Sequence, residues 1–282
     1  MSGRYRFDTH VHTSETSACG KVSGRDVAWC YRAAGYQGIM ITDHYHKAYF
    51  DSLGQVSAEE KVEAYLTGYR EAKAEGDRIG LDVILGMEFR NTETDDDFLI
   101  IGVTEEFLYQ HPLSYELPLS QAIELFHQNG MLVIQAHPVR FAVAPDPGWE
   151  MLGSFRNQEM LAMTEQYLDM PRVSFSQWSK QKKQGMEGTY PYPLRLQVCS
   201  LRLEDQLDGI EVYNGNFHWT QSPEEIRQIL ERHPEYIKTS GSDYHEAGHL
   251  ARGGIWLSRR ARTADELRQA LTDGCIADWI CS

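Results

Sequence analysis

Residues 6–20 read RFDTHVHTSETSACG, in which His10 and His12 are separated by a single valine. The residues that lead into this pair predict a strand, and alternate side chains of a strand point to the same face. His10 and His12 therefore project from one face, and Val11 projects from the other. Two imidazoles held side by side in this way can bind one metal ion together.

The rest of the chain alternates strand-like and helix-like segments. Further strands are predicted at 38–42, 82–89, 97–103, 131–136, 207–215, 236–245 and 253–257. Helices are predicted at 23–34, from Ser57 to about 78, and at 119–129, 222–231 and 263–271, with start and stop signals such as the capping box of Ser57 and Glu60. This alternation predicts an α/β fold with a mostly parallel sheet, closed or nearly closed into a barrel. In such barrels the active site lies at the C-terminal ends of the strands.

The alternation stops between Val139 and Leu207, in a stretch that contains many prolines, methionines that include Met151, Met160, Met163 and Met170, and the basic run SKQKKQG at 179–185. We interpret residues 141–206, approximately, as a partly helical insertion or lid in a single barrel domain that spans 1–282. Its methionine and tryptophan side chains are expected to form a small core of their own. The basic run is interpreted as a solvated helix face.

Composition limits the possible partners and the cellular location. The formal net charge of −14 over 282 residues argues against nucleic-acid binding, which depends on Lys and Arg. It does not argue against a small phosphorylated substrate, because bound divalent cations would reverse the local field. The five cysteines show no paired metal spacing, and no stretch is apolar enough for a membrane span or a signal peptide. We therefore expect a cytoplasmic protein without a membrane or nucleic-acid partner; its oligomeric state is left open.

Side chains that bind metals follow several of the predicted strands. They are His10, His12, His44, Glu88, His137, Asp243 and His245. Imidazole and carboxylate ligands together suit Zn, Mn or Fe. Because the candidates exceed what one tetrahedral ion can use, we expect a cluster of two or three divalent ions, with Glu88 as the bridging ligand.

The motifs DTHVHT, ITDH, GME, AHP and GSDYH occur in this order, each at a predicted strand end. They resemble the motifs of the PHP (polymerase and histidinol phosphatase) family of metal-dependent phosphoesterases, over roughly residues 5–140 and 207–260. The resemblance implies a distorted (β/α)7 TIM-like barrel with a trinuclear metal site at the C-terminal strand ends. It also implies hydrolysis of a small phosphomonoester or phosphodiester by a metal-bridging hydroxide.

The resemblance further implies how the ligands are shared among three cations. The first cation would be held by His10, His12, Glu88 and Asp243, the second by Glu88 and His137, and the third by His44 and His245. Two positions depart from the common pattern. Glu15 is the nearest available ligand where many members carry Asp or His after the first pair, and Asp97 stands where many carry His after the bridging Glu.

A phosphate ester also needs cationic side chains near the metals, and a proton donor for the leaving oxygen. Arg140 directly follows the His137 motif and is the first choice for the cation, with Arg90 and Arg252 as second choices. The proton donor could be His218, His249 or a metal-bound water.

Other polar residues near these motifs have more ordinary interpretations. Glu211 could be a direct ligand or could orient a histidine, and Asp43 is interpreted as an orienting residue. His46 is left out as a loop residue, and Cys19 is interpreted as a small residue in a glycine turn, although it could also be a ligand.

Two rival functions remain open at this stage. An amidohydrolase-type barrel also begins with a histidine pair. Such barrels lack the bridging Glu motif and usually carry a carboxylated lysine or a further histidine at a strand end, and no lysine follows a strand in the middle of this chain. A metal-stabilised module without catalytic activity would fit a loss of ligands, as the substitutions at Glu15 and Asp97 could indicate. Metal content and a substrate screen would separate these cases.

Overall fold

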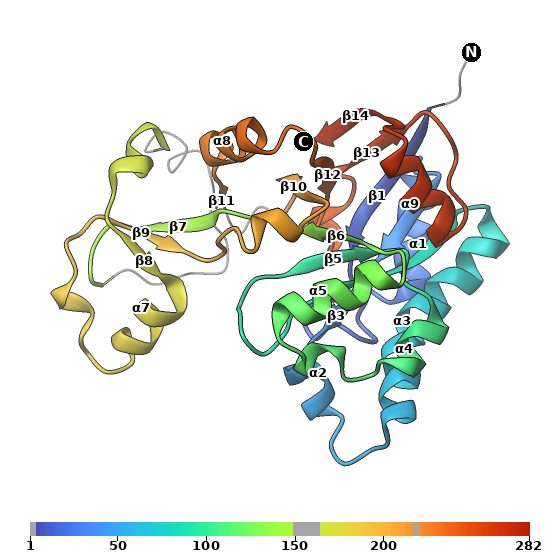
Figure 1. The fold of residues 1–282 in the computed structure, drawn as a ribbon, viewed down its shortest axis with the longest axis horizontal. Coiled ribbons are helices and arrows are strands. Elements are labelled where there is room, and N and C mark those ends of the chain that lie inside the picture. Colours follow the sequence, from blue (N-terminus) through green and yellow to red (C-terminus); the bar gives the residue numbers. More distant parts are fainter. Residues whose placement is uncertain (1–3, 149–163, 217–219) are drawn as a thin grey trace.

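The computed structural model describes residues 4–148, 164–216 and 220–282 (Figure 1). Its main sheet contains β1 (Tyr5–Val11), β2 (Gly38–Ile41), β3 (His44–Tyr45), β4 (Asp82–Phe89), β5 (Phe98–Ile101), β6 (Leu132–Gln135), β10 (Gly209–Asn214), β12 (Ile237–Gly241), β13 (Gly253–Leu257) and β14 (Ile276–Cys281). The strand order is β12-β10-β6-β5-β4-β2-β1-β13-β14, with β3 paired to β4. Beyond β12, Tyr244 bridges to Val11 of β1, so the sheet is nearly closed into a barrel.

The sheet is mixed, which corrects the prediction of a mostly parallel one. β5 is antiparallel to both β4 and β6, and β13 is antiparallel to β1 and β14. The reason is the short connection between β4 and β5, residues 90–97, because a parallel crossover needs a dozen or more residues. As a result, the start of β5 lies at the same edge of the sheet as the end of β4, where Phe89 pairs with Phe98.

The five predicted helices are confirmed, and each covers the outside of the barrel or connects its strands (Figure 1). They are α1 (Gly24–Ala33), α3 (Ala58–Ile79), α5 (Leu119–Gln128), α8 (Pro223–Arg232) and α9 (Ala264–Thr272). The capping box of Ser57 and Glu60 is present, and α3 ends at Gly80 in the left-handed conformation. Two short helices, α2 (Lys47–Ser52) and α4 (Glu105–Gln110), and the edge strand β14 were not predicted. Short 3-10 turns lie at η1 (Ser114–Glu116), η2 (Thr164–Asp169), η3 (Glu187–Thr189), η4 (Glu204–Gln206) and η5 (Ala247–His249).

Helices α1 and α3 approach each other closely because glycines stand at the contact. A Cβ atom on Gly24 would overlap the carbonyl oxygen of Gly68. A Cβ atom on Gly68 would overlap the hydroxyl of Thr13, which donates a hydrogen bond of 2.6 Å to Asp43. Gly68 thus lets α3 pack against the segment that follows β1, and that segment carries His12.

The Gly68→Ala substitution is expected to destabilise the protein, although alanine at an ordinary helix position would stabilise it by about 1 kcal/mol. The expected change in stability has the opposite sign here because the added methyl group overlaps Thr13, and overpacking typically costs about 1–3 kcal/mol. Denaturant unfolding measures the change, with Thr67→Ala at the neighbouring exposed position of α3 as control. A stability equal to or above that of the wild type would contradict the close approach.

The region that interrupts the barrel forms a small lobe with its own four-stranded sheet, seen at the left of Figure 1. It consists of β7 (Arg140–Ala144), β8 (Arg172–Ser174), α7 (Phe175–Lys182), β9 (Leu194–Gln197) and β11 (Thr220–Gln221), in the sheet order β11-β7-β9-β8. The predicted helical content is present as α7, but the sheet was not predicted. Its strand β11 comes from outside the predicted range of 141–206.

The small core of this lobe is only partly the one expected. Trp178 is buried against Ala142 and Leu196, and Met170 packs beside a second cluster that contains Phe141. The expected contributions of Trp149, Met151, Met160 and Met163 lie outside the described residues. The basic run begins on α7, where Lys180 and Lys182 lie in the last turn.

A buried arginine connects this lobe to the barrel. Arg195 of β9 is fully buried, forms an ion pair with Glu225 of α8, and lies 4.2 Å from the ring centroid of Phe141. Since a buried ion pair is costly to break, this contact fixes the small sheet against α8. Within the ranges that the structure describes, no helix has the length and apolarity needed to cross a membrane.

Candidate metal centre

Imidazole and carboxylate side chains from several strand ends meet at one edge of the barrel. The structure brings together His10, His12, His44, Glu88, Asp97, His137, Asp243 and His245. Asp97 reaches this edge because it directly precedes β5, which runs antiparallel to its neighbours. The other residues lie in or just beyond β1, β4, β6 and β12, or at the start of β3.

Glu88 lies at the centre of this cluster and is almost completely buried. Its Oε1 atom lies 3.0 Å from Nε2 of His137 and 3.3 Å from Nε2 of His10. Its Oε2 atom lies 2.7 Å from Nδ1 of His44 and 3.4 Å from Nε2 of His12. One carboxylate is therefore shared among four imidazoles, as a ligand that bridges several cations would be.

Asp243 provides a second shared carboxylate. Its Oδ1 atom lies 3.4 Å from Nε2 of His10, 3.3 Å from Nε2 of His12 and 3.4 Å from Nδ1 of His245. Burial alone would raise the pKa of Asp243, but the nearby charges of His10 and His245 lower it well below its usual range. In the same way, His44 and His10 outweigh the effect of burial and lower the pKa of Glu88. Both carboxylates are therefore held in the anionic form that binds cations.

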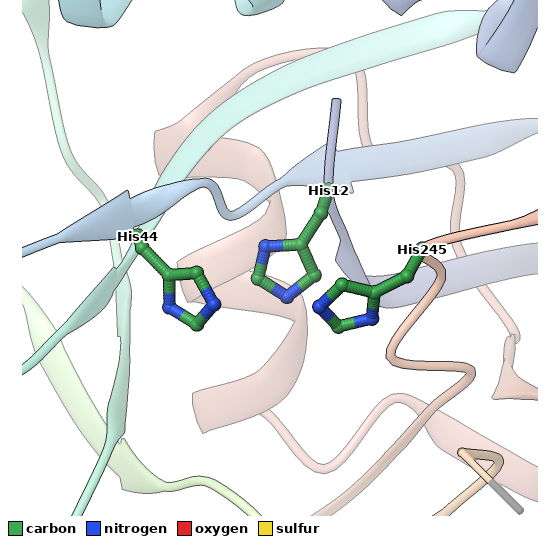
Figure 2. A group of neighbouring side chains, drawn as sticks. All are labelled: His12, His44 and His245. Atoms are coloured by element: carbon green, nitrogen blue, oxygen red, sulfur yellow. The ribbon is translucent and has the colours of Figure 1, made fainter. Parts of the chain in front are cut away.

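The ligand atoms form four overlapping groups, and within each group the atoms lie within 4.8 Å of one another. The groups are His10-His12-Asp243, His10-Glu88-His137, His44-Glu88-Asp97 and His12-His44-His245. Figure 2 shows the rings of the last group facing one another, although they come from the segment after β1, from β3 and from the segment after β12.

Several of these atoms have no hydrogen-bond partner among the described residues. They are Nε2 of His10, Nε2 of His12, Nδ1 of His44 and Oε2 of Glu88, and all four are buried. The 2.7 Å contact between Nδ1 of His44 and Oε2 of Glu88 lacks the geometry of a hydrogen bond. Buried polar atoms without a partner are costly and rare in folded proteins, unless an ion or a water satisfies them. Since nitrogen and carboxylate oxygen are the donors that Zn, Mn and Fe accept, the residues fit divalent cations of this kind.

Residues behind the cluster hold the ligands in position. Oε1 of Glu211 lies 3.0 Å from Nδ1 of His10, and Oε2 accepts a hydrogen bond of 2.9 Å from the backbone N–H of His137. Asp43 accepts a hydrogen bond of 2.7 Å from Ser17, whose hydroxyl lies 3.2 Å from Nδ1 of His12. These contacts favour the orienting role for Glu211 and give Asp43 the same role.

The backbone is strained at two of the candidate ligands. His137 has φ of 30° and Asp243 has φ of 50°, in the left-handed region that side chains other than glycine seldom adopt. Strain of this kind persists where surrounding contacts fix a residue, and it is concentrated at functional sites. At Asp243 those contacts include Arg140, whose Nη2 donates a hydrogen bond of 2.8 Å to Oδ2.

Glu15 does not belong to any of the four groups found among the described residues. Both of its carboxylate oxygens accept the backbone N–H of Gly24, at 3.1 and 3.0 Å. This corrects the expectation that Glu15 points towards the cluster, and the physical reason is the N-terminus of α1, where N–H groups lack partners and attract a carboxylate.

Asp97 reaches the cluster, but it also binds an arginine. Its carboxylate accepts two hydrogen bonds from Arg90, at 2.7 and 2.6 Å, and its Oδ2 atom lies 3.8 Å from Nε2 of His137. His46, which was left out of the predicted ligands, accepts a hydrogen bond from the N–H of Tyr49 and caps α2.

A cavity of about 370 Å³ opens beside the cluster. Its walls include His44, Glu88, His137 and Asp243, together with three cationic side chains, Lys21, Arg90 and Arg140. Val198 and Cys199, which follow β9 of the small lobe, also line the cavity. The cavity thus offers room for a small anionic molecule between the candidate ligands and the interrupting region.

The three candidates for phosphate binding and the two for proton donation are placed differently. Arg140 lines the cavity and is almost fully buried, Arg90 also lines it, and Arg252 is not among the described lining residues. His249 lines the cavity, and its Nδ1 accepts the backbone N–H of His245 at 3.2 Å. His218 lies outside the described residues.

Two cysteines line this cavity that were not among the predicted site residues. Sγ of Cys199 lies 3.5 Å from Nδ1 of His137, and burial raises the pKa of this thiol. Burial would also raise the pKa of Cys19, but hydrogen bonds with His245 and His44 lower it to about 7. No spacing in the sequence indicated Cys199, whereas Cys19 was weighed as a possible ligand because of its position after the first histidine pair, and was interpreted as a small residue in a glycine turn.

No family model matches the chain, and no curated protein matches it. Among solved structures, a two-domain protein from Bacteroides vulgatus that contains a predicted PHP-like metal-dependent phosphoesterase matches 97% of the chain, with 15% identity and a TM-score of 0.52. The chain spans 64% of the length of that protein.

Two further solved structures are similar more loosely. A protein from Bifidobacterium adolescentis, assigned as a metal-dependent phosphoesterase, matches 86% of this chain and 88% of its own, with 17% identity and a TM-score of 0.42. An amidohydrolase from Chromobacterium violaceum, solved with bound sulfate and no metal, matches 94% of this chain and 96% of its own, with 14% identity and a TM-score of 0.45. The likeness to the Bacteroides vulgatus protein shows a common fold, and the other two are too distant to support an argument.

Proposed function

We propose that this chain, whose fold is that of a protein containing a PHP-like metal-dependent phosphoesterase, is a metal-dependent hydrolase of a small phosphate ester. The observation that carries the proposal is the position of Glu88, shared among four imidazoles beside a cavity with a buried arginine. The cations and the arginine together suit a substrate that carries negative charge on a transferable phosphoryl group.

Two or three divalent ions of Zn, Mn or Fe would be held by the four groups described above. Such ions, when bound, lower the pKa of water to supply a hydroxide nucleophile and polarise the phosphoryl oxygens. Glu88 and Asp243 keep the site anionic, while Glu211 and Asp43 fix the orientation of His10 and His12. Rigid ligands of this kind avoid reorganisation when charge develops on the substrate.

Arg140 is proposed to bind the phosphoryl group. Its Nη2 atom donates to Oδ2 of Asp243 at 2.8 Å and to Oδ1 of Asn214 at 2.7 Å. Both of these hydrogen bonds with described residues use the same nitrogen, so Nε and Nη1 are left for oxygens of a ligand in the cavity. Asp243 and other groups outweigh the effect of burial and raise the pKa of Arg140, which therefore stays charged.

His249 is proposed as the proton donor to the leaving oxygen, with His218 as the alternative. His249 is buried, lines the cavity and lies beside His245 in the turn η5. A general acid must come within hydrogen-bond reach of the leaving oxygen, directly or through one water, and a residue in the wall of the cavity meets this requirement.

Metal removal provides the test of this function. After chelation the protein is expected to lose activity towards an aryl phosphate, and addition of Mn or Zn is expected to restore it. Binding should also raise thermal stability, because a ligand at 100 times its Kd stabilises the folded state by about 2.7 kcal/mol.

The assay also separates the rival functions. Turnover of an amide or lactam, with no turnover of any phosphate ester, would favour an amidohydrolase. Absence of bound transition metal and of any thermal shift would favour a module without catalysis. A panel of phosphorylated metabolites then identifies the substrate class.

A further inference from the structure

We propose that the sulfur of Cys19 is a ligand of the cation site formed by His12, His44 and His245. The inference rests on the proposed metal-dependent function, because it concerns the same centre. It assigns a sulfur donor to a centre whose four groups of ligand atoms contain nitrogen and oxygen only, so the exposed Cys19 thiol would have to turn towards the imidazoles when the ion binds.

The three imidazoles leave one coordination position to fill. Their ligand atoms lie within 4.8 Å of one another, and Figure 2 shows the rings turned towards a common point. His12 is fully buried, and its Nε2 atom has no hydrogen-bond partner among the described residues. Three protein ligands around a divalent ion such as zinc are normally completed by a fourth ligand, from the protein or from solvent.

The turn after β1 brings Cys19 to this position through backbone contacts at both of its ends. On one side, Ser17 accepts the backbone N–H of His44 at 3.1 Å through its hydroxyl. On the other side, the backbone N–H of Lys21 donates to the carbonyl of His245 at 2.8 Å. Cys19 lies between these two anchors and lines the cavity together with His44 and His245.

Glycine at position 20 makes this turn possible. The N–H of Gly20 donates to the carbonyl of Ser17 at 2.8 Å, and a Cβ atom on Gly20 would lie 2.6 Å from the carbonyl oxygen of Thr13. Any larger residue would push the turn away from Thr13 and move Cys19 with it. The tight turn therefore holds the thiol at the wall of the cavity.

Glu15, the other acidic or sulfur-bearing residue in this turn region, is directed elsewhere. Its two oxygens accept the N–H of Gly24 at the start of α1. A metal-binding role would require Glu15 to give up that contact, whereas Cys19 lines the cavity together with His44 and His245. The ligand expected shortly after the histidine pair is therefore present, but it is sulfur.

A sulfur ligand changes which metal the site prefers. When the ion binds, a sulfur–metal bond forms and the thiol proton passes to solvent, so the charge of the ligand set becomes more negative by one. Thiolate is a soft ligand and favours Zn over Mn or Mg at a site that otherwise has imidazoles. We therefore expect this site to retain Zn or Co under conditions in which Mn still exchanges at the carboxylate-rich part of the cluster.

Cobalt substitution tests the sulfur bond directly. The full chain is freed of metal, loaded with Co²⁺ and measured in the near ultraviolet, where a sulfur–cobalt bond gives a charge-transfer band. The wild type should show the band and Cys19→Ser should lack it. Glu15→Gln and Cys199→Ser should keep it, and the second of these variants controls for the other thiol in the cavity. A band that survives Cys19→Ser would overturn the assignment.

Metal affinity gives a second readout. The Kd for zinc at the weakest site should rise on the order of 100-fold in Cys19→Ser, since even residues behind a ligand contribute 10- to 100-fold. Cys19→Asp should recover binding of Mn but not of Zn. Equal zinc affinity in the wild type and in Cys19→Ser would contradict the proposal.

A measurement on the wild type covers the case in which a variant fails to fold. A thiol reagent, followed by peptide mass mapping, should modify Cys19 slowly in the zinc-loaded protein and at least tenfold faster after chelation. Cys281, which is exposed and does not line the cavity, should react equally in both forms. Equal reaction of Cys19 in both forms would overturn the proposal.

None of these readouts depends on turnover of a phosphate ester. A cobalt band that requires Cys19 in a protein without esterase activity would support the sulfur ligand and contradict the proposed function. Full esterase activity, together with a cobalt band that Cys19→Ser leaves unchanged, would support the proposed function and contradict the sulfur ligand.

Discussion

The Glu88→Gln variant is expected to lose bound metal and to hydrolyse a phosphate ester on the order of 10³-fold more slowly than the wild type. The substitution keeps the size of the side chain but removes the charge that four imidazoles share. Metal ions contribute several kcal/mol of transition-state stabilisation, and a factor of ten in rate corresponds to about 1.4 kcal/mol. Metal analysis and kcat/KM with an aryl phosphate measure the two losses in the same preparation.

The matched control is Glu75→Gln on α3. Glu75 forms hydrogen bonds with Arg78 and does not line the cavity, so the same chemical change there should leave metal content and kcat/KM unchanged. If Glu88→Gln kept its full complement of metal, the bridging role would be refuted. If it lost metal but retained activity, the reaction would not depend on the cluster.

The positions of the candidate ligands could be predicted to the extent that local pattern determines them. His10 and His12 share a face because strand geometry alternates side chains, and His44, Glu88, His137 and Asp243 follow apolar runs that could only be strands. A nearly closed sheet then brings these strand ends together.

What could not be predicted depends on pairing between distant segments. Asp97 lies at the edge of the sheet with the cluster, but the antiparallel direction of β5 that brings it there was not foreseen. The strands β7 and β9 are short, and a long stretch of chain separates them. Local sequence patterns therefore do not predict the sheet that they form. The orientation of Glu15 is decided by competition with the N-terminus of α1, which periodicity does not reveal.

The interrupting region supplies part of the cavity wall. Val198 and Cys199 follow β9 and line the cavity, where Cys199 lies beside His137, and Arg140 is the first residue of β7. The small lobe therefore begins with a proposed phosphate-binding residue and returns to the cavity at its end. Substrate choice would then depend on the lobe, while the chemistry depends on the barrel.

The Arg140→Ala variant is expected to lower kcat/KM for a phosphate ester by about 10²- to 10³-fold, the typical effect of removing one preorganised donor from a transition state. Arg140 is the buried cation of the cavity wall, and its guanidinium is fixed by Asp243 and Asn214. The Arg140→Lys variant should show a smaller fall in kcat/KM, because lysine keeps the positive charge but cannot form the bidentate hydrogen bonds of a guanidinium. Inorganic phosphate, as the product, should inhibit the alanine variant more weakly than the wild type.

Metal content decides how this result is interpreted, because Arg140 also contacts a candidate ligand. Asp243 keeps its Oδ1 contacts with His10 and His12 when the arginine is removed, so we expect the bound metal to remain. A fall in kcat/KM with unchanged metal and weaker phosphate inhibition would identify Arg140 as the residue that binds the phosphoryl group. If kcat/KM instead fell only in proportion to the lost metal, and phosphate inhibited the metal-loaded fraction as strongly as the wild type, the role of Arg140 would be limited to holding Asp243 in position. The exposed Arg227 of α8 serves as the control position for loss of an arginine, since its partners Glu224 and Glu231 lie on the same helix.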